Sequence, residues 1–207
     1  MANPYPAINR QPPTANTAKP VEESAKVTEA ATVQELWDRE MIRDCLYRYC
    51  RGIDRADETL LRAVYWPDAI DNHGAYQGSA SGFIDWALAL LKTVERCVHQ
   101  VHNILIDHRG DKAAVESSFT ALQRQPGEDG SLVECVLAGR YLDRFERRGG
   151  EWRIAYRTVV FDWINETPAP AITDAARFRH RQPLGGRWPE DPVYALIGER
   201  LVTSNEA

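Results

Sequence analysis

The chain has 207 residues, of which 43% are apolar and 27% charged, and its formal net charge is −5. This length suits one domain of about 150 residues with extensions, and the composition is that of an ordinary globular protein. The negative charge disfavours nucleic acid or an anionic membrane as the main partner. No apolar run approaches the roughly 20 residues that cross a bilayer.

The N-terminal stretch lacks the apolar segment of a secretory signal. The four cysteines are scattered and form no CxxC motif. This usage is typical of reduced, mostly buried thiols, so we expect a cytoplasmic protein.

Composition divides the chain into three parts. Residues 1–30 are rich in Pro, Ala, Asn and Thr and are expected to form a disordered or draping arm. Residues 31–165 carry the periodic patterns of a folded domain. Residues 166–207 are rich in Pro and Gly, with a last short helix expected near residues 194–201, and we expect them to cap the pocket or a neighbouring subunit. The apolar residues of this extension that need burial are Trp188, Tyr194, Leu196 and Ile197.

Apolar residues three and four positions apart predict helices at the start of the domain. The first helix runs from about Val33 to Asp54, with Thr32 as a candidate N-cap. A short second helix covers Glu58 to Val64, and a strongly apolar third helix covers Phe83 to Val94. Residues 74–82, GAYQGSASG, read as a loop.

From residue 97 the apolar period changes to two, which predicts strands. The expected strands are Cys97–His108, Ala113–Arg124, Leu132–Arg147 and Trp152–Asp162, preceded by a short strand at Tyr65–His73. Helices followed by consecutive strands with short Gly-rich turns predict an α+β domain with a curled antiparallel sheet. The strand 132–147 is apolar on both faces, which predicts a homo-oligomer, either a dimer or a trimer.

Two residues suggest proton chemistry. Asp54 ends the first helix at the edge of its buried face, and alternation on the strand 97–108 places His99 on one face with Asn103. A histidine exchanges a proton near neutral pH, and a buried Asp fixes its tautomer. The alternative is a satisfied core histidine and a helix-end carboxylate. His99 and His102 point to opposite faces of a strand, so no metal site is expected.

No GxGxxG or GxxxxGK[ST] motif is present, so no nucleotide cofactor is implied. Aromatic residues are either core or pocket wall, and a wall built from them suits an aromatic or polycyclic substrate. The aromatic residues considered for this wall include Trp66, Phe119 and Phe161.

Four stretches resemble the SnoaL-like branch of the nuclear transport factor 2-like superfamily over about residues 30–165. They are YRYCRGIDRAD in the first helix, YWPDA in the first strand, HQVHNILI in the next, and YLDRFERRGGEWRIAYR across the last two. The resemblance implies a cone-shaped α+β barrel with helices packed on a curved, mainly antiparallel sheet, and it favours a trimer.

Within this superfamily the chain is similar to cofactor-free lyases, namely hexachlorocyclohexane dehydrochlorinase, bile-acid 7α-dehydratase and scytalone dehydratase. By resemblance, His99 and Asp54 form a His–Asp dyad, and Arg157 matches the basic residue of the last strand. Tyr49 stands where the dehydrochlorinase has a lysine, as in the bile-acid dehydratase, which argues against halide elimination. The dehydratase has a further deep acidic residue, and none is found at the corresponding region of the strand 113–124.

The expected function is therefore a cofactor-independent lyase for a small hydrophobic, aromatic or alicyclic hydroxylated compound, either a dehydratase or an enzyme releasing formaldehyde from a lignin-derived diaryl compound. A cone that only binds a ligand or a partner is one alternative, and an isomerase of the ketosteroid type is another. The expected catalytic residues are His99, Asp54, Tyr49 and Arg157. The expected substrate-binding residues are Asn103, Trp66, Phe119 and Phe161.

Overall fold

The structure is a computed structural model that describes residues 32–203, with side chains described as far as Gly198. The arm predicted over residues 1–30 lies outside this range. The elements in chain order are α1 (Val33–Arg55), α2 (Glu58–Val64), β1 (Tyr65–Asn72), β2 (Gln77–Ser79), α3 (Ala80–Leu91), β3 (Arg96–Arg109), β4 (Lys112–Pro126), β5 (Leu132–Arg148), β6 (Glu151–Pro168), α4 (Asp174–Phe178) and α5 (Pro192–Thr203).

Helix α1 begins and ends where its sequence provides caps. The Thr32 hydroxyl accepts a hydrogen bond from the Glu35 backbone N–H at 3.1 Å, which confirms the predicted N-cap. The helix ends at Ala56, whose left-handed φ of 50° turns the chain towards α2. A Cβ atom at position 52 would lie 2.8 Å from the Leu61 side chain, so Gly52 lets α1 and α2 approach closely.

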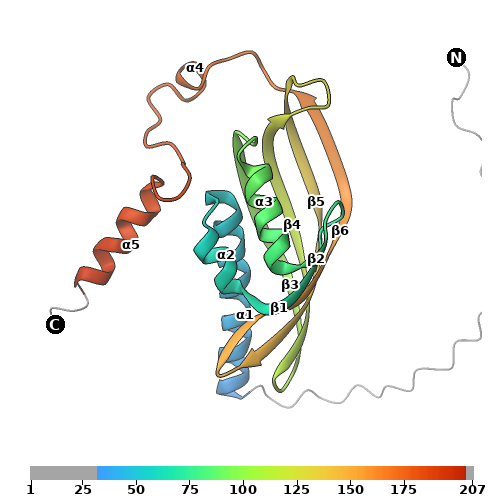
Figure 1. Cartoon of the computed structure of the whole chain (residues 1–207). Coiled ribbons are helices and arrows are strands. Elements are labelled where there is room, and N and C mark those ends of the chain that lie inside the picture. The colour runs from blue at the N-terminus through green and yellow to red at the C-terminus, as the bar shows by residue number, and fades with distance from the viewer. Residues whose placement is uncertain (1–31, 204–207) are drawn as a thin grey trace, which may run out of the picture. The chain divides into compact units, whose positions relative to one another are not determined.

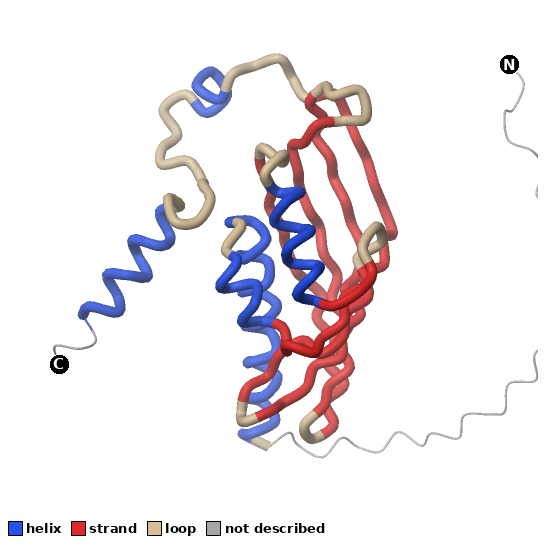
Figure 2. The backbone as a smooth tube through the Cα atoms, in the orientation of Figure 1, coloured by secondary structure: helices blue, strands red, loops and turns tan. Residues whose placement is uncertain are grey.

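The sheet has the strand order β2–β1–β6–β5–β4–β3. Neighbouring strands are antiparallel except β1 and β6, which run parallel. Helices α1, α2 and α3 lie on one face of this curved sheet (Figures 1 and 2). The core forms between them, and α1 contributes a buried stripe at the predicted helical spacing that includes Ile42, Leu46, Tyr49 and Ile53. The predicted α+β class with a curved, mainly antiparallel sheet is confirmed.

Segment 74–82, predicted as a loop, contains β2 and the first residues of α3. Helix α3 begins at Ala80 because the Ser79 hydroxyl accepts a hydrogen bond from the Gly82 N–H at 3.1 Å and caps the helix. The three residues of β2 are too few to show a period of two, so periodicity could not predict this strand or its pairing with β1. Strand β6 also continues to Pro168, beyond the predicted end at residue 162.

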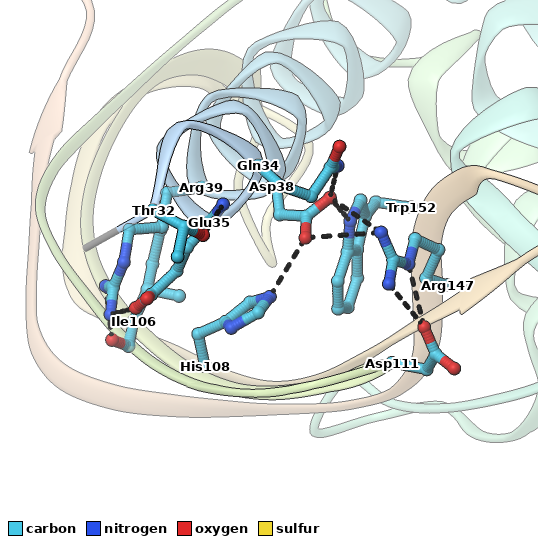
Figure 3. Close-up of polar contacts among 10 residues, drawn as sticks. All are labelled: Thr32, Gln34, Glu35, Asp38, Arg39, Ile106, His108, Asp111, Arg147 and Trp152. Atoms are coloured by element: carbon cyan, nitrogen blue, oxygen red, sulfur yellow. Dashed lines mark hydrogen bonds and ion pairs between the residues drawn. The ribbon is translucent and has the colours of Figure 1, made fainter.

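Polar contacts around Asp38 link the first half of α1 to the sheet (Figure 3). The Asp38 carboxylate, 2% exposed, accepts hydrogen bonds from Trp152 Nε1 at 2.9 Å and from Gln34 Nε2 at 2.9 Å. Arg147 Nη1 and His108 Nε2 lie 3.2 Å from its two oxygens. These partners come from β3, β5 and β6, so one buried carboxylate joins the helix to three strands.

The extension after β6 docks on the C-terminal ends of α1 and α3. The Arg187 guanidinium donates to the carbonyl oxygens of Asp54 at 3.2 Å, Leu91 at 3.2 Å and Val94 at 2.9 Å. The Trp188 backbone N–H donates to the Arg55 carbonyl at 2.7 Å. Arg187 thereby satisfies carbonyl groups that helix ends leave without intrahelical partners.

Other residues of the extension differ from expectation. Tyr194 is partly buried, and its hydroxyl donates to Asp57 Oδ2 at 2.9 Å. Trp188 and Leu196, which were expected to need burial, are 53% and 55% exposed. Ile197 is 36% exposed. None of the helices in residues 32–203 combines the length and apolar character that crossing a bilayer requires.

Candidate active site

A cavity of about 300 Å³ lies between the helices and the sheet. Much of its wall is aromatic, with side chains from Tyr49, Phe83, Trp86, Phe119, Tyr141 and Phe161. Its polar lining includes His73, His99, Gln123 and Gln125. An apolar wall with a few polar groups is the usual form of a small-molecule site.

His99 lines this cavity, and Asp54 contacts it from behind the cavity wall. Asp54 lies in the last turn of α1, and His99 lies near the start of β3. The Asp54 oxygens accept hydrogen bonds from the His99 backbone N–H at 3.0 and 2.9 Å. Oδ1 also lies 2.8 Å from His99 Nδ1. With Nδ1–H held by the carboxylate, Nε2 is the ring nitrogen left for a ligand.

The pair sets the charge of His99. Burial alone would lower the pKa of this imidazole, but hydrogen bonds to Asp54 and then to Cys97 outweigh burial and raise the pKa to about 10. The Cys97 Sγ atom lies 3.4 Å from Nδ1. At neutral pH His99 is therefore an imidazolium held by Asp54.

Tyr49 reaches the cavity from the buried face of α1, one and a half turns before Asp54. Its ring stands edge-on to Tyr141, with centroids 5.6 Å apart and planes at 79°. Burial raises the pKa of the Tyr49 phenol, which Arg157 only partly offsets, so the hydroxyl keeps its proton and acts as a donor.

Arg157 lies behind the tyrosines and is absent from the cavity lining. It is fully buried, and its Nε and Nη2 atoms each donate to Asp143 at 2.7 Å. Its guanidinium carbon lies 4.1 Å from the ring centroids of both Tyr49 and Tyr141. The prediction that Arg157 faces the cavity with His99 is corrected, because a buried charge needs close partners and Asp143 supplies them.

Asn103 is also misplaced by the sequence analysis. Between His102 and Leu105 the β3–β4 register shifts, which inserts one extra residue into β3. Asn103 lies in this bulge with a φ of 51°, and it is exposed. The bulge reverses the alternation, so Asn103 does not line the cavity with His99.

Of the predicted aromatic wall residues, two are in place and one is not. Phe119 and Phe161 line the cavity with His99. Trp66 instead borders a separate hollow beside α2 and α3, and its Nε1 donates to the Glu146 carbonyl at 3.0 Å. Trp66 was assigned from residue type alone, which does not distinguish one hollow from another.

His73, a residue without an expected role, follows β1 and lines the same cavity. Its Nδ1 atom lies 3.2 Å from Asp71 Oδ1. A signal was available, because residues two apart on a strand share a face, so Asp71 and His73 could have been paired. Two carboxylates on other strands, Asp71 on β1 and Asp143 on β5, are buried.

Asp54, Cys97 and His99 also form a possible metal-binding group, because one ligand atom from each lies within 4.8 Å of the others. Carboxylate, thiolate and imidazole are donors that zinc accepts. Asp54 already engages His99 Nδ1 at 2.8 Å. Binding a metal through Nδ1 would break this contact, so a metal and the His–Asp pair are competing uses of the same side chains.

A curved sheet covered by helices around an internal cavity defines an α+β cone of the nuclear transport factor 2-like superfamily. Residues 34–158 match the SnoaL-like domain family, and the chain belongs to that family. None of the curated proteins compared with the chain matches it significantly.

Solved structures share the fold. LinA-type3, a hexachlorocyclohexane dehydrochlorinase from Novosphingobium barchaimii, is 21% identical with a TM-score of 0.58, and the match covers 66% of this chain and 93% of that one. A proposed scytalone dehydratase from Novosphingobium aromaticivorans is 19% identical with a TM-score of 0.57, covering 66% and 91%. A protein of unknown function from Mycobacterium tuberculosis is 22% identical with a TM-score of 0.51, covering 84% and 94%.

Proposed function

We propose that the protein is a cofactor-independent lyase whose His99–Asp54 pair takes a proton from a small, hydrophobic, hydroxylated aromatic or alicyclic compound. The observation that carries this proposal is an imidazole, held at Nδ1 by Asp54, on the wall of an aromatic cavity. Asp54 orients the ring and stabilises the imidazolium that proton removal creates. The names of two fold neighbours, a dehydrochlorinase and a proposed dehydratase, agree with elimination chemistry.

Tyr49 completes the proposed mechanism. Its protonated phenol donates a hydrogen bond to the oxygen on which charge develops as the proton leaves carbon. Arg157, paired with Asp143, packs its guanidinium against the Tyr49 and Tyr141 rings and holds them in place. Arg157 therefore acts through the tyrosines and does not touch the substrate.

The raised pKa of His99 has a kinetic consequence. Proton removal requires the neutral imidazole, and a pKa of about 10 leaves only a small fraction neutral at pH 7. For a substrate whose leaving group needs no protonation, kcat/KM should therefore rise with pH and level off near pH 10. A kcat/KM that falls as the pH rises from 7 to 9 would contradict the role of His99 as base.

The test uses 3-hydroxy-1-phenylpropan-1-one, a β-hydroxy ketone small enough for the cavity. Loss of water gives phenyl vinyl ketone, whereas retro-aldol cleavage gives acetophenone and formaldehyde, so chromatography separates the two lyase reactions. The wild-type protein should form one of these products. His99→Gln should lower turnover by about 10³-fold or more, and Asp54→Asn by somewhat less. Tyr49→Phe should lower it by about 10²–10³-fold, the size expected for one oxyanion donor.

His102→Gln is the matched control, because His102 is exposed on β3 and does not line the cavity. Binding can be followed separately through fluorescence of Trp86, which lines the cavity. Binding of the ketone without turnover by the wild-type protein would contradict the lyase proposal and favour a cone that only binds its ligand.

A further inference from the structure

We propose that His73, held by Asp71, is a second proton-transfer residue of the cavity and protonates the oxygen that leaves the substrate. This inference rests on the proposed lyase function and adds the general acid that water loss requires. His73 and His99 both line the cavity, and they come from opposite ends of the sheet order, next to β1 and on β3.

The His73 ring is held on three sides. Its Nδ1 atom contacts Asp71 Oδ1 at 3.2 Å. The ring stacks on Phe83, with centroids 4.4 Å apart and planes at 21°, and it meets the edge of Phe161 with centroids 6.5 Å apart. Its own backbone N–H donates to the Tyr76 carbonyl at 2.7 Å, which closes the turn after β1. A ring fixed in this way presents Nε2 in one direction.

The Asp71 carboxylate is buried and hydrogen-bonded, and it can therefore hold the His73 ring in place. It is fully buried, at 0% exposure, and its second oxygen accepts a hydrogen bond from the Tyr65 hydroxyl at 2.6 Å. A buried carboxylate is costly unless it is hydrogen-bonded on both oxygens, and Asp71 meets that condition through Tyr65 and His73. The two pairs are alike, because in each a carboxylate oxygen contacts Nδ1 of a histidine that lines the cavity.

The two carboxylates contact their histidines differently. Asp54 directs both oxygens at His99, through the backbone N–H and Nδ1. Asp71 divides its oxygens between Tyr65 and His73, and its contact to the ring is longer. Asp71 holds Nδ1 of His73 and leaves Nε2 to face the leaving oxygen, whereas His99 keeps the proposed role of base.

In the proposed step, His99 Nε2 takes the proton from the carbon beside the carbonyl, and the C–H electron pair becomes the new C=C bond. The C–O bond breaks with its electron pair on oxygen, and His73 Nε2–H protonates that oxygen to give water. His99 ends with one proton more and His73 with one fewer, and exchange with water restores both.

Two probes that give the same product separate the roles of the histidines. To form phenyl vinyl ketone, 3-hydroxy-1-phenylpropan-1-one loses water, which needs an acid, whereas 3-chloro-1-phenylpropan-1-one loses chloride, which does not. Rates are corrected for the reaction without protein. His73→Gln should slow the hydroxy compound by about 10²–10⁴-fold and the chloro compound by less than threefold. His99→Gln should slow both.

Asp71→Asn provides a second variant of nearly the same size, and it should show the same preference with a smaller loss. His102→Gln, on the exposed face of β3, should change neither rate. Equal loss on both probes, or no loss on the hydroxy compound, in a His73→Gln protein with an unchanged circular dichroism spectrum would overturn the assignment. A wild-type protein inactive on both probes would overturn the lyase function and this inference with it. If the wild type is active, a failed prediction for His73→Gln overturns only the role of His73.

Discussion

Asp54 determines both the orientation and the charge of His99. Its oxygens contact the backbone N–H and the ring Nδ1 of the same residue, so the carboxylate positions the strand and the imidazole together. Few side chains are better placed to be tested by one substitution, because Asn keeps the shape of Asp and removes its charge.

Asp54→Asn should lower the pKa of His99 well below about 10, since burial remains and the Asp54 carboxylate, which raises the pKa most, is gone. Nitrogen-15 NMR of the imidazole measures this directly. Asp44→Asn, an exposed position on the same helix, is the control and should leave the pKa of His99 unchanged. A His99 that still titrates near pH 10 in Asp54→Asn would contradict the assignment.

The same substitution changes how stability depends on pH. The folded-state pKa of His99, about 10, lies above the ordinary value, so the pair stabilises the fold fully below about pH 6.5 and loses this contribution as the pH rises through 10. The free energy of unfolding of Asp54→Asn should therefore fall furthest below that of the wild type at pH 6. Urea titrations at pH 6 and pH 10 measure the difference, and an equal loss at both pH values would exclude this linkage.

Asn103 offers a second test at the scale of one residue. Its φ of 51° lies in the left-handed region, which Gly and Asn tolerate better than other residues. Asn103→Ala should lower the free energy of unfolding by about 1 kcal/mol, whereas Asn103→Gly should be close to neutral. Urea denaturation of both variants measures this. A more stable Ala variant would mean that the bulge is not required.

At the scale of elements, periodicity was sufficient for the long helices and strands and insufficient for details set by other strands. The spacing of Ile42, Leu46 and Tyr49 predicted α1 because that spacing reflects one buried face. Alternation failed at Asn103, since a bulge depends on the partner strand β4 and has no local signature in this sequence. The partner of Arg157 was equally hidden, because Asp143 lies on a neighbouring strand and only the register brings the two together.

The extension is the other element with a consequence for the site. Arg187 binds the Asp54 carbonyl together with the end of α3, and Val193 of α5 borders a hollow of about 340 Å³ on whose wall Asp54 and His99 also lie. Residues 187–193 therefore contact the last turn of α1 and border a hollow beside the dyad.

Arg187→Ala should loosen the last turn of α1 and lower turnover by about tenfold to 10²-fold, since small displacements of a catalytic group are costly. Hydrogen exchange should become faster at the C-terminal end of α1. Arg181→Ala, at an exposed position of the same extension, is the control. Unchanged exchange and turnover in Arg187→Ala would show that the extension does not position Asp54.

At the scale of the whole molecule, the face of the sheet away from the helices carries an apolar row. Val98, Leu122 and Val136 are register neighbours on β3, β4 and β5, and they are 45%, 45% and 36% exposed. Such a row on neighbouring strands favours contact with another subunit. We propose that this face joins copies of the chain in a homo-oligomer, with a trimer expected over a dimer.

Light scattering should therefore give a multiple of the 23.4 kDa chain mass. Leu122→Lys places a charge in the middle of the row and should shift the protein towards the monomer. Val33→Lys, at a position that is 84% exposed at the start of α1, should leave the mass unchanged. A monomeric wild-type protein at micromolar concentration would contradict the proposal.

The bulge at Asn103 divides β3 into two halves with separate alternation of inward and outward side chains. In the first half the inward positions carry His99 and Val101, at the candidate site. In the second half they carry Ile106 and His108, which hold α1 through the core and Asp38. Removing one residue at the bulge would make the alternation continuous and turn the inward side chains of one half outward. Substitutions in the first half can therefore change the site and leave the second half unaffected, provided that the extra residue is kept.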